Sequence, residues 1–332
     1  MVLPLVSAII TTYNNKRWLG RSVASILRQS GVSVEVIVVD NASLDQAARY
    51  VREHFPDVRV VELPVNRGFG AGNNAGAKVA RGKYLFIGND DSVLDRNCIE
   101  EMAAVMEKDA SIGVCQGRIS SYDYPRTIQS TGLFFNYSGV LVGDRKRDDA
   151  DLSRPNEIFA AGGPFLVRRD VFEKVGGFDK DFFLYFEEVD LCWRVWLWGF
   201  RVVYAPRAML YHKGGATTRQ LSEAFILTHS VRNRLHSYLK NMGFPRILIA
   251  LMVQAGVLSA AGSVFLFRGK PLQSLAILKA VGWNIWHLPK EIAKRFGIQR
   301  MRRISDRELF RRVGAALPLE RLLAISGFRR TG

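Results

Sequence analysis

Cysteine and acidic residues are the two components that this sequence has little of. Its 332 residues include three cysteines, Cys98, Cys115 and Cys192, which lie far apart and form no CxxC pair. This odd, scattered set argues against a disulfide framework and against a thiolate zinc site, and it suits a reducing cytosol. The first residues, MVLPLVSAIITTYNN, lack a basic segment, and their apolar run has only the length of a strand. We therefore expect no signal peptide.

The shortage of acidic residues is concentrated in the last third of the chain. The formal net charge is +16, and from Lys240 to the end there are 17 Lys and Arg against 4 Asp and Glu, which leaves about +3 for the first 239 residues. A tail of this kind requires an anionic partner, either nucleic acid or an anionic membrane surface. Because its basic residues adjoin apolar segments and no recognised nucleic-acid-binding fold, we expect no nucleic-acid partner.

Short apolar runs alternate with helical patterns in the first third of the chain. We expect strands at residues 6–12, 34–39, 58–63 and 84–88, and helices at 18–27, 47–54, 71–79 and 97–107. The runs lack polar alternation, as in strands buried on both faces, and their alternation with helices indicates right-handed βαβ units. The predicted fold class is therefore α/β, with a Rossmann-like, mainly parallel sheet flanked by helices. Such sheets bind ligands at the carboxyl ends of their strands.

The later segments are less regular. Residues 119–157 are polar and rich in loops, with weak strand signals at 132–142. We expect a strand at 158–168, a helix within 182–200, a strand at 201–205, a loop at 211–218, and helices from 222 to the end.

Two adjacent carboxylates, Asp90 and Asp91, follow Asn89 at the end of the strand YLFIG. Adjacent carboxylates repel each other unless a cation or hydrogen-bond donors neutralise them. A hard divalent cation takes one or two carboxylates plus substrate phosphates, and can neutralise a diphosphate leaving group. An ordinary turn is the alternative, since Asn and Asp favour turns.

A glycine-rich segment, residues 66–76, opens a helix with the sequence NRGFGAGNNAG. Glycine allows close approach of the backbone to phosphates, and a helix N-terminus favours anions. The segment has one residue too many for a GxGxxG dinucleotide fingerprint and follows the third strand, so we reject that reading. A helix start with glycines for tight packing remains an alternative.

Three acids occur within four residues in the segment FFLYFEEVDLCW. On a helix, Glu187 and Asp190 share one face, while Glu188 points about 100° away. One acid could therefore face a substrate while another anchors the helix, and the aromatic neighbours would raise a carboxylate pKa, as suits a general base. Acids that complement the helix dipole are the alternative. His212, in LYHKGGATT, is a candidate ligand because the glycines indicate an irregular loop.

Taken in this order, these motifs resemble family 2 glycosyltransferases and, within them, a bacterial rhamnosyltransferase-like group. The resemblance covers residues 6–218, about two thirds of the chain. It rests on VSAIITTYNN, VEVIVVDNASLD, NRGFGAGNNAG, the NDD cluster, GGFDKDFFLYFEEVDLCWR and VYAPRAMLYHKGG. It implies a GT-A fold, inversion at the anomeric carbon, a nucleotide-sugar donor, and a divalent metal, Mg²⁺ or Mn²⁺.

The resemblance also implies a nucleotide-sugar site made of Thr11, Tyr13, Asp40, Asn41, Arg67, Gly68, Asn74, Asn89 and Asp90. Within this set Thr11, Tyr13 and Asp40 line the base pocket, Arg67 and Asn74 lie near the base or diphosphate, and Asp90 contacts the ribose.

The resemblance assigns the metal to Asp91 and His212, and the general base to Glu188, with Glu187 and Asp190 as supporting acids. The chain departs from the commoner pattern in two places. A Glu stands where Asp usually follows the first Glu, so the base is one methylene longer. The DxD motif begins with Asn89, so the metal depends more heavily on Asp91.

The C-terminal third contains an uncharged stretch at residues 247–267, long enough to span a bilayer, and a second apolar stretch at 271–288 that Lys279 interrupts. A single span would place the Arg-rich tail outside, against the positive-inside tendency. We expect an in-plane or hairpin association with anionic lipid at the cytoplasmic face of the membrane. The alternative is a helical subdomain that packs on the catalytic core or on a second copy of the chain, as in a homo-oligomer.

The expected organisation is a catalytic domain at 1–220, with a nucleotide-binding half at 1–118 and an acceptor-binding half at 119–220, followed by a basic, apolar helical region at 221–332. We expect an enzyme that moves a sugar, with rhamnose from dTDP-rhamnose as the first expectation and UDP-sugars as the next. The expected acceptor is a saccharide, in lipid-linked form, in cell-envelope polysaccharide synthesis. A catalytically dead scaffold is the alternative that Asp91, Glu188 and His212 argue against.

Overall fold

The computed structural model describes residues 5–135, 141–143, 155–215 and 221–314. The strands are β1 (Val6–Thr12), β2 (Val34–Asp40), β3 (Arg59–Glu62), β4 (Tyr84–Asn89), β5 (Ser92–Leu94), β6 (Ile112–Ser121), β7 (Ile128–Ser130), β8 (Leu133–Phe135), β9 (Leu141–Gly143), β10 (Asn156–Glu157), β11 (Phe165–Arg168) and β12 (Arg201–His212). The helices are α1 (Lys16–Leu27), α2 (Ala47–His54), α3 (Phe69–Val79), α4 (Cys98–Lys108), α5 (Arg169–Lys174), α6 (Glu187–Leu197), α7 (Glu223–Asn241), α8 (Arg246–Phe267), α9 (Pro271–Trp286), α10 (Leu288–Arg300) and α11 (Asp306–Val313).

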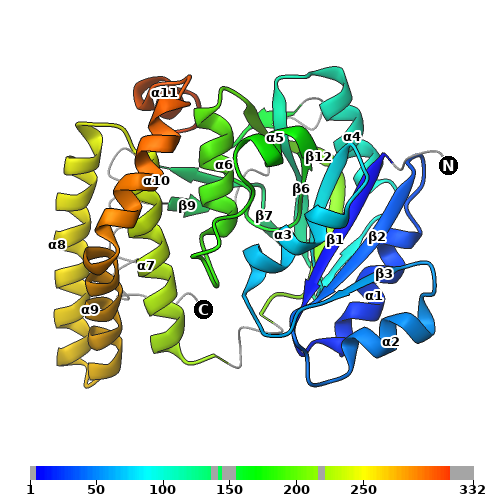
Figure 1. Ribbon diagram of the computed structural model, residues 1–332, viewed down its shortest axis with the longest axis horizontal. Helices are drawn as coiled ribbons and strands as arrows, with labels where there is room; N and C mark the ends of the chain where they lie inside the picture. The colour runs from blue at the N-terminus through cyan, green and yellow to red at the C-terminus, as the bar shows by residue number, and fades with distance from the viewer. Residues whose placement is uncertain (1–4, 136–140, 144–154, 216–220, 315–332) are drawn as a thin grey trace.

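A mixed sheet forms the centre of the fold, in the order β10-β12-β6-β11-β4-β1-β2-β3, with β5 pairing with β12 and β7 with β6 (Figure 1). The first four long strands are parallel, as predicted, and only β11 runs against its neighbours β4 and β6 in the centre. Successive strand residues enter hydrophobic clusters on opposite faces: Ile9 packs toward α3 and α6, and Ile10 packs toward α1, α2 and α4. Burial on both faces explains the unbroken apolar runs of the sequence.

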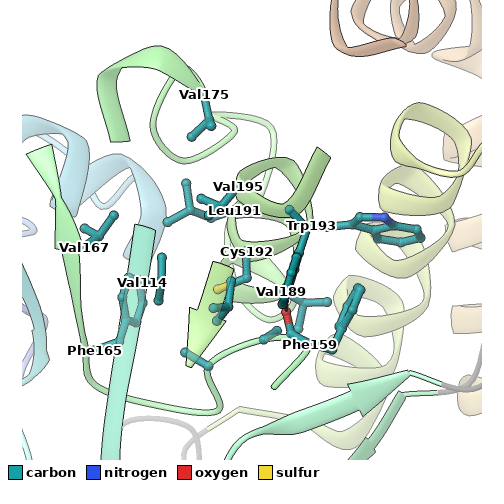
Figure 2. Close-up of a cluster of buried hydrophobic side chains, with 14 of the residues drawn as sticks. Val114, Phe159, Phe165, Val167, Val175, Val189, Leu191, Cys192, Trp193 and Val195 are labelled. Atoms are coloured by element: carbon teal, nitrogen blue, oxygen red, sulfur yellow. Dashed lines mark hydrogen bonds between the residues drawn. The ribbon is translucent and has the colours of Figure 1, made fainter. Parts of the chain in front are cut away.

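Helix α6 lies against one face of the sheet and supplies much of its core. Figure 2 shows Val189, Leu191, Trp193 and Val195 of this helix beside strand side chains such as Val114. Trp193 and Trp196 are almost completely buried, and the Trp196 indole donates to the backbone carbonyl oxygen of Phe159 at 3.0 Å. The helix that carries the three acids is therefore held rigidly by the core.

The helix expected within 182–200 is α6, Glu187–Leu197, and it begins at Glu187 because Tyr185 and Phe186 just before it adopt left-handed backbone conformations with φ of 68° and 75°. Two other predicted boundaries near the expected site are wrong. The expected loop at 211–218 is a strand up to His212, since β12 pairs with β5 and β6 on its two sides. Residues 216–218 lie outside the described residues. The segment expected to be loop-rich from residue 119 instead begins with the last three residues of β6.

The C-terminal region is helical, as predicted, and part of it packs into the main core. Tyr238 of α7, Ile247 of α8 and Phe310 of α11 belong to the same hydrophobic cluster as α6, and the Phe310 ring stacks on Phe135 at 5.6 Å between centroids. A smaller cluster joins α7, α8 and α9. Figure 1 shows α8 and α9 side by side at the edge of the molecule, with α7 between them and α6.

Candidate active site

The carboxyl ends of several strands bring the predicted polar residues to one edge of the sheet. Thr12 pairs with Asp40 across β1 and β2, and Thr11 pairs with Asn89 across β1 and β4. His212 ends β12 and pairs with Ser92 of β5, directly after the carboxylates. Residues far apart in the sequence therefore meet because parallel strands end together.

Asp91 and His212 are in direct contact, although 120 residues separate them in the chain. The Asp91 Oδ1 atom lies 3.0 Å from His212 Nε2, and the Asn89 amide nitrogen lies 3.2 Å from the same ring atom. The other ring nitrogen, Nδ1, lies 3.2 Å from the Oε1 atom of Gln129, whose amide donates to the His212 carbonyl oxygen. Gln129 thus orients the imidazole, as partners of metal-ligating histidines commonly do.

This pair fits a divalent ion. An octahedral ion with bonds of about 2.1 Å places neighbouring ligand atoms about 3 Å apart, which is the separation seen here. The carboxylate oxygen and the imidazole nitrogen are both suitable ligands, and two protein ligands leave positions for phosphate oxygens. Asp91 and His212 would therefore hold the metal, which would supply charge neutralisation at a diphosphate.

Asp90 points into the protein, away from this pair of ligands. Its carboxylate accepts hydrogen bonds from Thr12 Oγ1 at 2.7 Å and from the Asn15 amide at 2.8 Å. Burial, together with the neighbouring charge of Asp91, raises the pKa of Asp90 to about 7. The carboxylate ties the loop after β1 to the end of β4. Sequence reasoning missed Thr12 and Asn15, although the polar run TTYNN at a strand end is a signal for them.

Asn41 holds the glycine-rich segment against the end of β2. Its amide donates to the Gly68 carbonyl oxygen at 3.1 Å, and its Oδ1 accepts from the Arg67 backbone nitrogen at 2.9 Å. Gly68 has a φ of 82°, and a Cβ there would lie 2.0 Å from the Phe183 carbonyl oxygen. Only glycine fits this close approach. The Arg67 side chain is exposed beside it.

The remaining predicted nucleotide ligands lie around the same edge. Asp40 accepts hydrogen bonds from the backbone nitrogens of Ser43 and Ala48, at 2.8 and 3.2 Å. Both ends of the Asn74 amide bond the backbone of Phe178, at 2.8 and 2.9 Å, so this side chain joins α3 to the segment before α6. The buried Thr11 hydroxyl has no hydrogen-bond partner among the described residues. Tyr13 is half-buried just beyond β1.

The three acids of α6 differ sharply in their surroundings. Glu188 is half-buried, whereas the Glu187 side chain is buried and its Oε1 finds no hydrogen-bond partner in the part of the chain that the structure describes. Burial raises the pKa of Glu188. Burial and the neighbouring Glu188 raise the pKa of Glu187 well above its ordinary value. Glu188 is thus the acid that has both solvent access and an elevated basicity.

Asp190 anchors α6 to α7. Its carboxylate is fully buried and pairs with Arg194 at 2.9 Å and with Lys240 at 3.0 Å. It also accepts from the Ser237 hydroxyl at 3.1 Å and the Asn241 amide at 2.7 Å. The pKa of Asp190 is lowered because the cations of Lys240 and Arg194 outweigh the effect of burial.

Helix α7 also holds the left-handed turn just before the acids. The buried Asn233 amide donates to the carbonyl oxygens of Leu184 and Tyr185, at 2.9 and 2.8 Å. Left-handed non-glycine residues cost about 1–3 kcal/mol each and persist where surrounding contacts determine them. Sequence reasoning missed Asn233, because nothing in the local pattern of α7 shows that it faces this turn.

A second cluster of possible metal ligands, formed by Asp179, Asp181 and His236, lies close by. The carboxylates of this cluster already form ion pairs with lysine ammonium groups. Lys294 lies 2.7 Å from Asp179 and 2.6 Å from Asp181, and Lys240 also contacts Asp179. These cations lower the pKa of Asp179 and tie the segment before α6 to α7 and α10. The cluster is therefore better suited to joining elements than to binding a metal.

The sheet, the carboxylate–imidazole pair at its edge and the acidic helix beside it define a glycosyltransferase of the GT-A fold. The chain belongs to glycosyl transferase family 2, whose family model matches residues 7–176.

Among curated relatives, the chain is 27% identical to the N-acetylglucosaminyl-diphospho-decaprenol L-rhamnosyltransferase of Mycobacterium tuberculosis, over 66% of this chain and 78% of the relative. It is 24% identical to the poly-beta-1,6-N-acetyl-D-glucosamine synthase of Staphylococcus epidermidis, over 62% of this chain and 49% of that protein.

Solved structures share the fold at lower identity. TarS 1-349 of S. aureus, in complex with UDP, is 15% identical with a TM-score of 0.56, and the match covers 89% of both chains. The mannosyltransferase PcManGT of Pyrobaculum calidifontis, in complex with GDP-Man and Mn²⁺, is 17% identical with a TM-score of 0.53, covering 86% of this chain and 88% of that one.

Proposed function

We propose that the chain is an inverting, metal-dependent glycosyltransferase that moves rhamnose from dTDP-rhamnose to a saccharide acceptor in cell-envelope polysaccharide synthesis. The observation that carries the chemistry is the contact between Asp91 and His212 at the carboxyl edge of the sheet, together with the half-buried Glu188 in the first turn of α6. The rhamnosyltransferase of Mycobacterium tuberculosis supports the sugar, and its diphospho-decaprenol substrate supports a lipid-linked acceptor. UDP-sugars are the second candidate donors, because TarS was solved with UDP.

In this mechanism the polar edge of the sheet binds the donor, and α6 presents the base. The acceptor hydroxyl gives its proton to the Glu188 carboxylate while its oxygen bonds the anomeric carbon. The bond from that carbon to the diphosphate oxygen breaks, and the electron pair leaves with the nucleoside diphosphate. A single displacement of this kind inverts the anomeric configuration. A metal on Asp91 and His212 would neutralise the leaving diphosphate.

A thermal-shift screen of nucleotide-sugars with Mg²⁺ or Mn²⁺ tests the donor. We expect dTDP-rhamnose to raise the melting temperature most, because a ligand that binds only the folded state stabilises it by mass action. The matched controls are dTDP-glucose and UDP-glucose at the same concentration. A larger shift with a UDP-sugar would replace the proposed donor, and no shift with any nucleotide-sugar would contradict the proposed function.

Replacing Asp91 tests the metal site. In Asp91→Ala we expect the affinity for dTDP or UDP to lose its dependence on Mn²⁺, because the ion then keeps one protein ligand. Calorimetry with and without Mn²⁺ measures this. Asp123→Ala is the control, since Asp123 is an exposed carboxylate nearby that pairs with Lys213 at 2.6 Å. Unchanged metal dependence in Asp91→Ala would remove Asp91 from the site.

A further inference from the structure

The exposed apolar side chains of this protein are concentrated on its C-terminal helices. Among the described residues, 15 of the 19 large apolar side chains that are exposed lie between Phe244 and Met301. Met252 on α8 is 67% exposed, Leu278 on α9 67%, and Trp286 at the end of α9 83%. Soluble surfaces rarely gather apolar groups in this way, and such a patch marks an interaction site.

Each of the helices α8, α9 and α10 has one side that is buried against the protein and one side that is exposed to solvent. On α8 the buried residues Ile247, Ala250, Gln254 and Leu258 follow helical spacing and face the rest of the protein. The opposite side exposes an uncharged stripe that runs from Leu248 to Phe267. Of the described helices, α8 is the one that is long and apolar enough to cross a membrane.

Helices α9 and α10 continue this stripe. Leu272, Leu275 and Leu278 are exposed along α9, and Ile292 and Phe296 are exposed one turn apart on α10. Helix α9 packs against α8, and α10 follows α9 in the chain and also contacts it (Figure 1). We name the exposed apolar side chains of α8, α9 and α10 the outer apolar face.

The charged side chains that residues 243–301 themselves carry at the surface are basic, although two of these lysines pair with carboxylates of other segments, Lys270 with Glu223 and Lys290 with Asp181. Between Gly243 and Met301 the sequence has eight Lys and Arg and one acidic residue, Glu291. Glu291 is only 1% exposed and lies against His236 inside the protein. The surface of these helices therefore presents cations, Lys279 and Arg300 among them, and no carboxylate. Apolar groups bordered by cations complement an anionic lipid surface.

The packing of α8 decides how deep this face can enter a bilayer. Helices α8 and α9 lie along α7, whose Arg232 guanidinium lies over the Trp283 ring of α9 and whose Lys240 pairs with buried Asp190. A membrane-crossing hairpin would carry these charges into the hydrocarbon, where each is costly. In-plane insertion buries only the outer apolar face and leaves α7 in water.

We propose that the outer apolar face docks the enzyme in the plane of an anionic bilayer, as a monotopic surface and not as a transmembrane span. This docking does not depend on the sugar that the enzyme transfers. It places the whole catalytic sheet on the same side of the membrane as α7.

Flotation of the full chain with vesicles tests this proposal without any sugar donor. We expect it to float with phosphatidylcholine vesicles that contain phosphatidylglycerol, and to float poorly with phosphatidylcholine alone. The double variant Met252→Asp/Leu278→Asp should lower binding by about 10-fold or more, because charge on the inserted face opposes insertion. The control Leu44→Asp/Val65→Asp changes two exposed apolar residues of the nucleotide-binding half and should bind as the unchanged chain does.

The depth of insertion is a second readout. We expect alkaline carbonate to release the bound protein, and brominated lipids to quench Trp286 only when the bromine lies near the headgroup, with Trp286→Phe as the blank. Retention after carbonate treatment would overturn the in-plane arrangement in favour of a span. A full chain that never floats overturns the proposal altogether. In that case, sedimentation could show that the unchanged chain is a dimer and that the Met252→Asp/Leu278→Asp variant is a monomer. This result would mean that the outer apolar face binds a second copy of the chain.

Discussion

Glu188→Gln should lower the transfer rate by roughly 10²-fold or more while leaving donor binding unchanged, since a general base contributes on this scale. The amide keeps the size of the side chain and its place in the first turn of α6, but it cannot accept the acceptor proton. The measurements are single-turnover transfer and calorimetry of the donor nucleotide. Glu188→Asp, which restores the commoner family pattern, should keep measurable activity.

The neighbouring acid is the matched control for this experiment. The Glu187 side chain is buried, so it is less accessible to an acceptor than Glu188, and glutamine has nearly the same size and shape. Glu187→Gln should therefore cost much less activity than Glu188→Gln. The opposite result would assign the base to Glu187.

The pH profile provides an independent check. The pKa of Glu188 is raised above the ordinary value of 4.5, and a base must be deprotonated to act, so kcat/KM should fall with decreasing pH at values above those usual for glutamate.

Lys240→Met should destabilise the protein by about 3 kcal/mol, because it removes one cation from a buried ion-pair network and leaves the buried Asp190 carboxylate with Arg194 as its remaining salt-bridge partner among the described residues. Lys240 is 1% exposed and lies between Asp190 of α6 and Asp179 of the segment before it. Methionine fills a similar volume, so the loss reports the charge and not a cavity. Urea denaturation of the two proteins measures the difference in the free energy of unfolding.

The control is an exposed ion pair between a lysine and a carboxylate. Lys83 lies 2.5 Å from Glu107, and both side chains are about half exposed, at 51% and 43%. Lys83→Met should change stability by at most about 1 kcal/mol, as is usual for surface pairs. Equal losses in the two variants would show that the buried network does not hold α6 against α7.

The local sequence pattern was sufficient to predict most strands and helices of residues 1–118. The unbroken apolar runs predicted β1, β2 and β4 to within a residue, because burial on both faces leaves no room for polar residues. The helix Ala47–His54 was predicted with its observed bounds. Parallel strands end at one edge, so the juxtaposition of Asp40 and Asn89 also followed from the order of elements.

Only the tertiary structure decided how the two halves of the site meet. The contact of Asp91 with His212 depends on β12 pairing with β5 up to its last residue, His212, and the left-handed turn before Glu187 depends on Asn233, 48 residues away in α7. The hydrophobic periodicity of a single segment predicts neither feature, because both arise from contacts between segments that are distant in the chain.

The same distinction holds for the C-terminal helices. The sequence by itself determined that they are helical, basic and apolar, since periodicity and composition are local properties. Which side of each helix enters the core and which side stays bare depends on where α7 and α11 pack, and Phe310 joining the cluster around α6 is visible only in the folded chain. An apolar residue is buried by the residues that lie next to it in space, and the tertiary structure determines which residues these are.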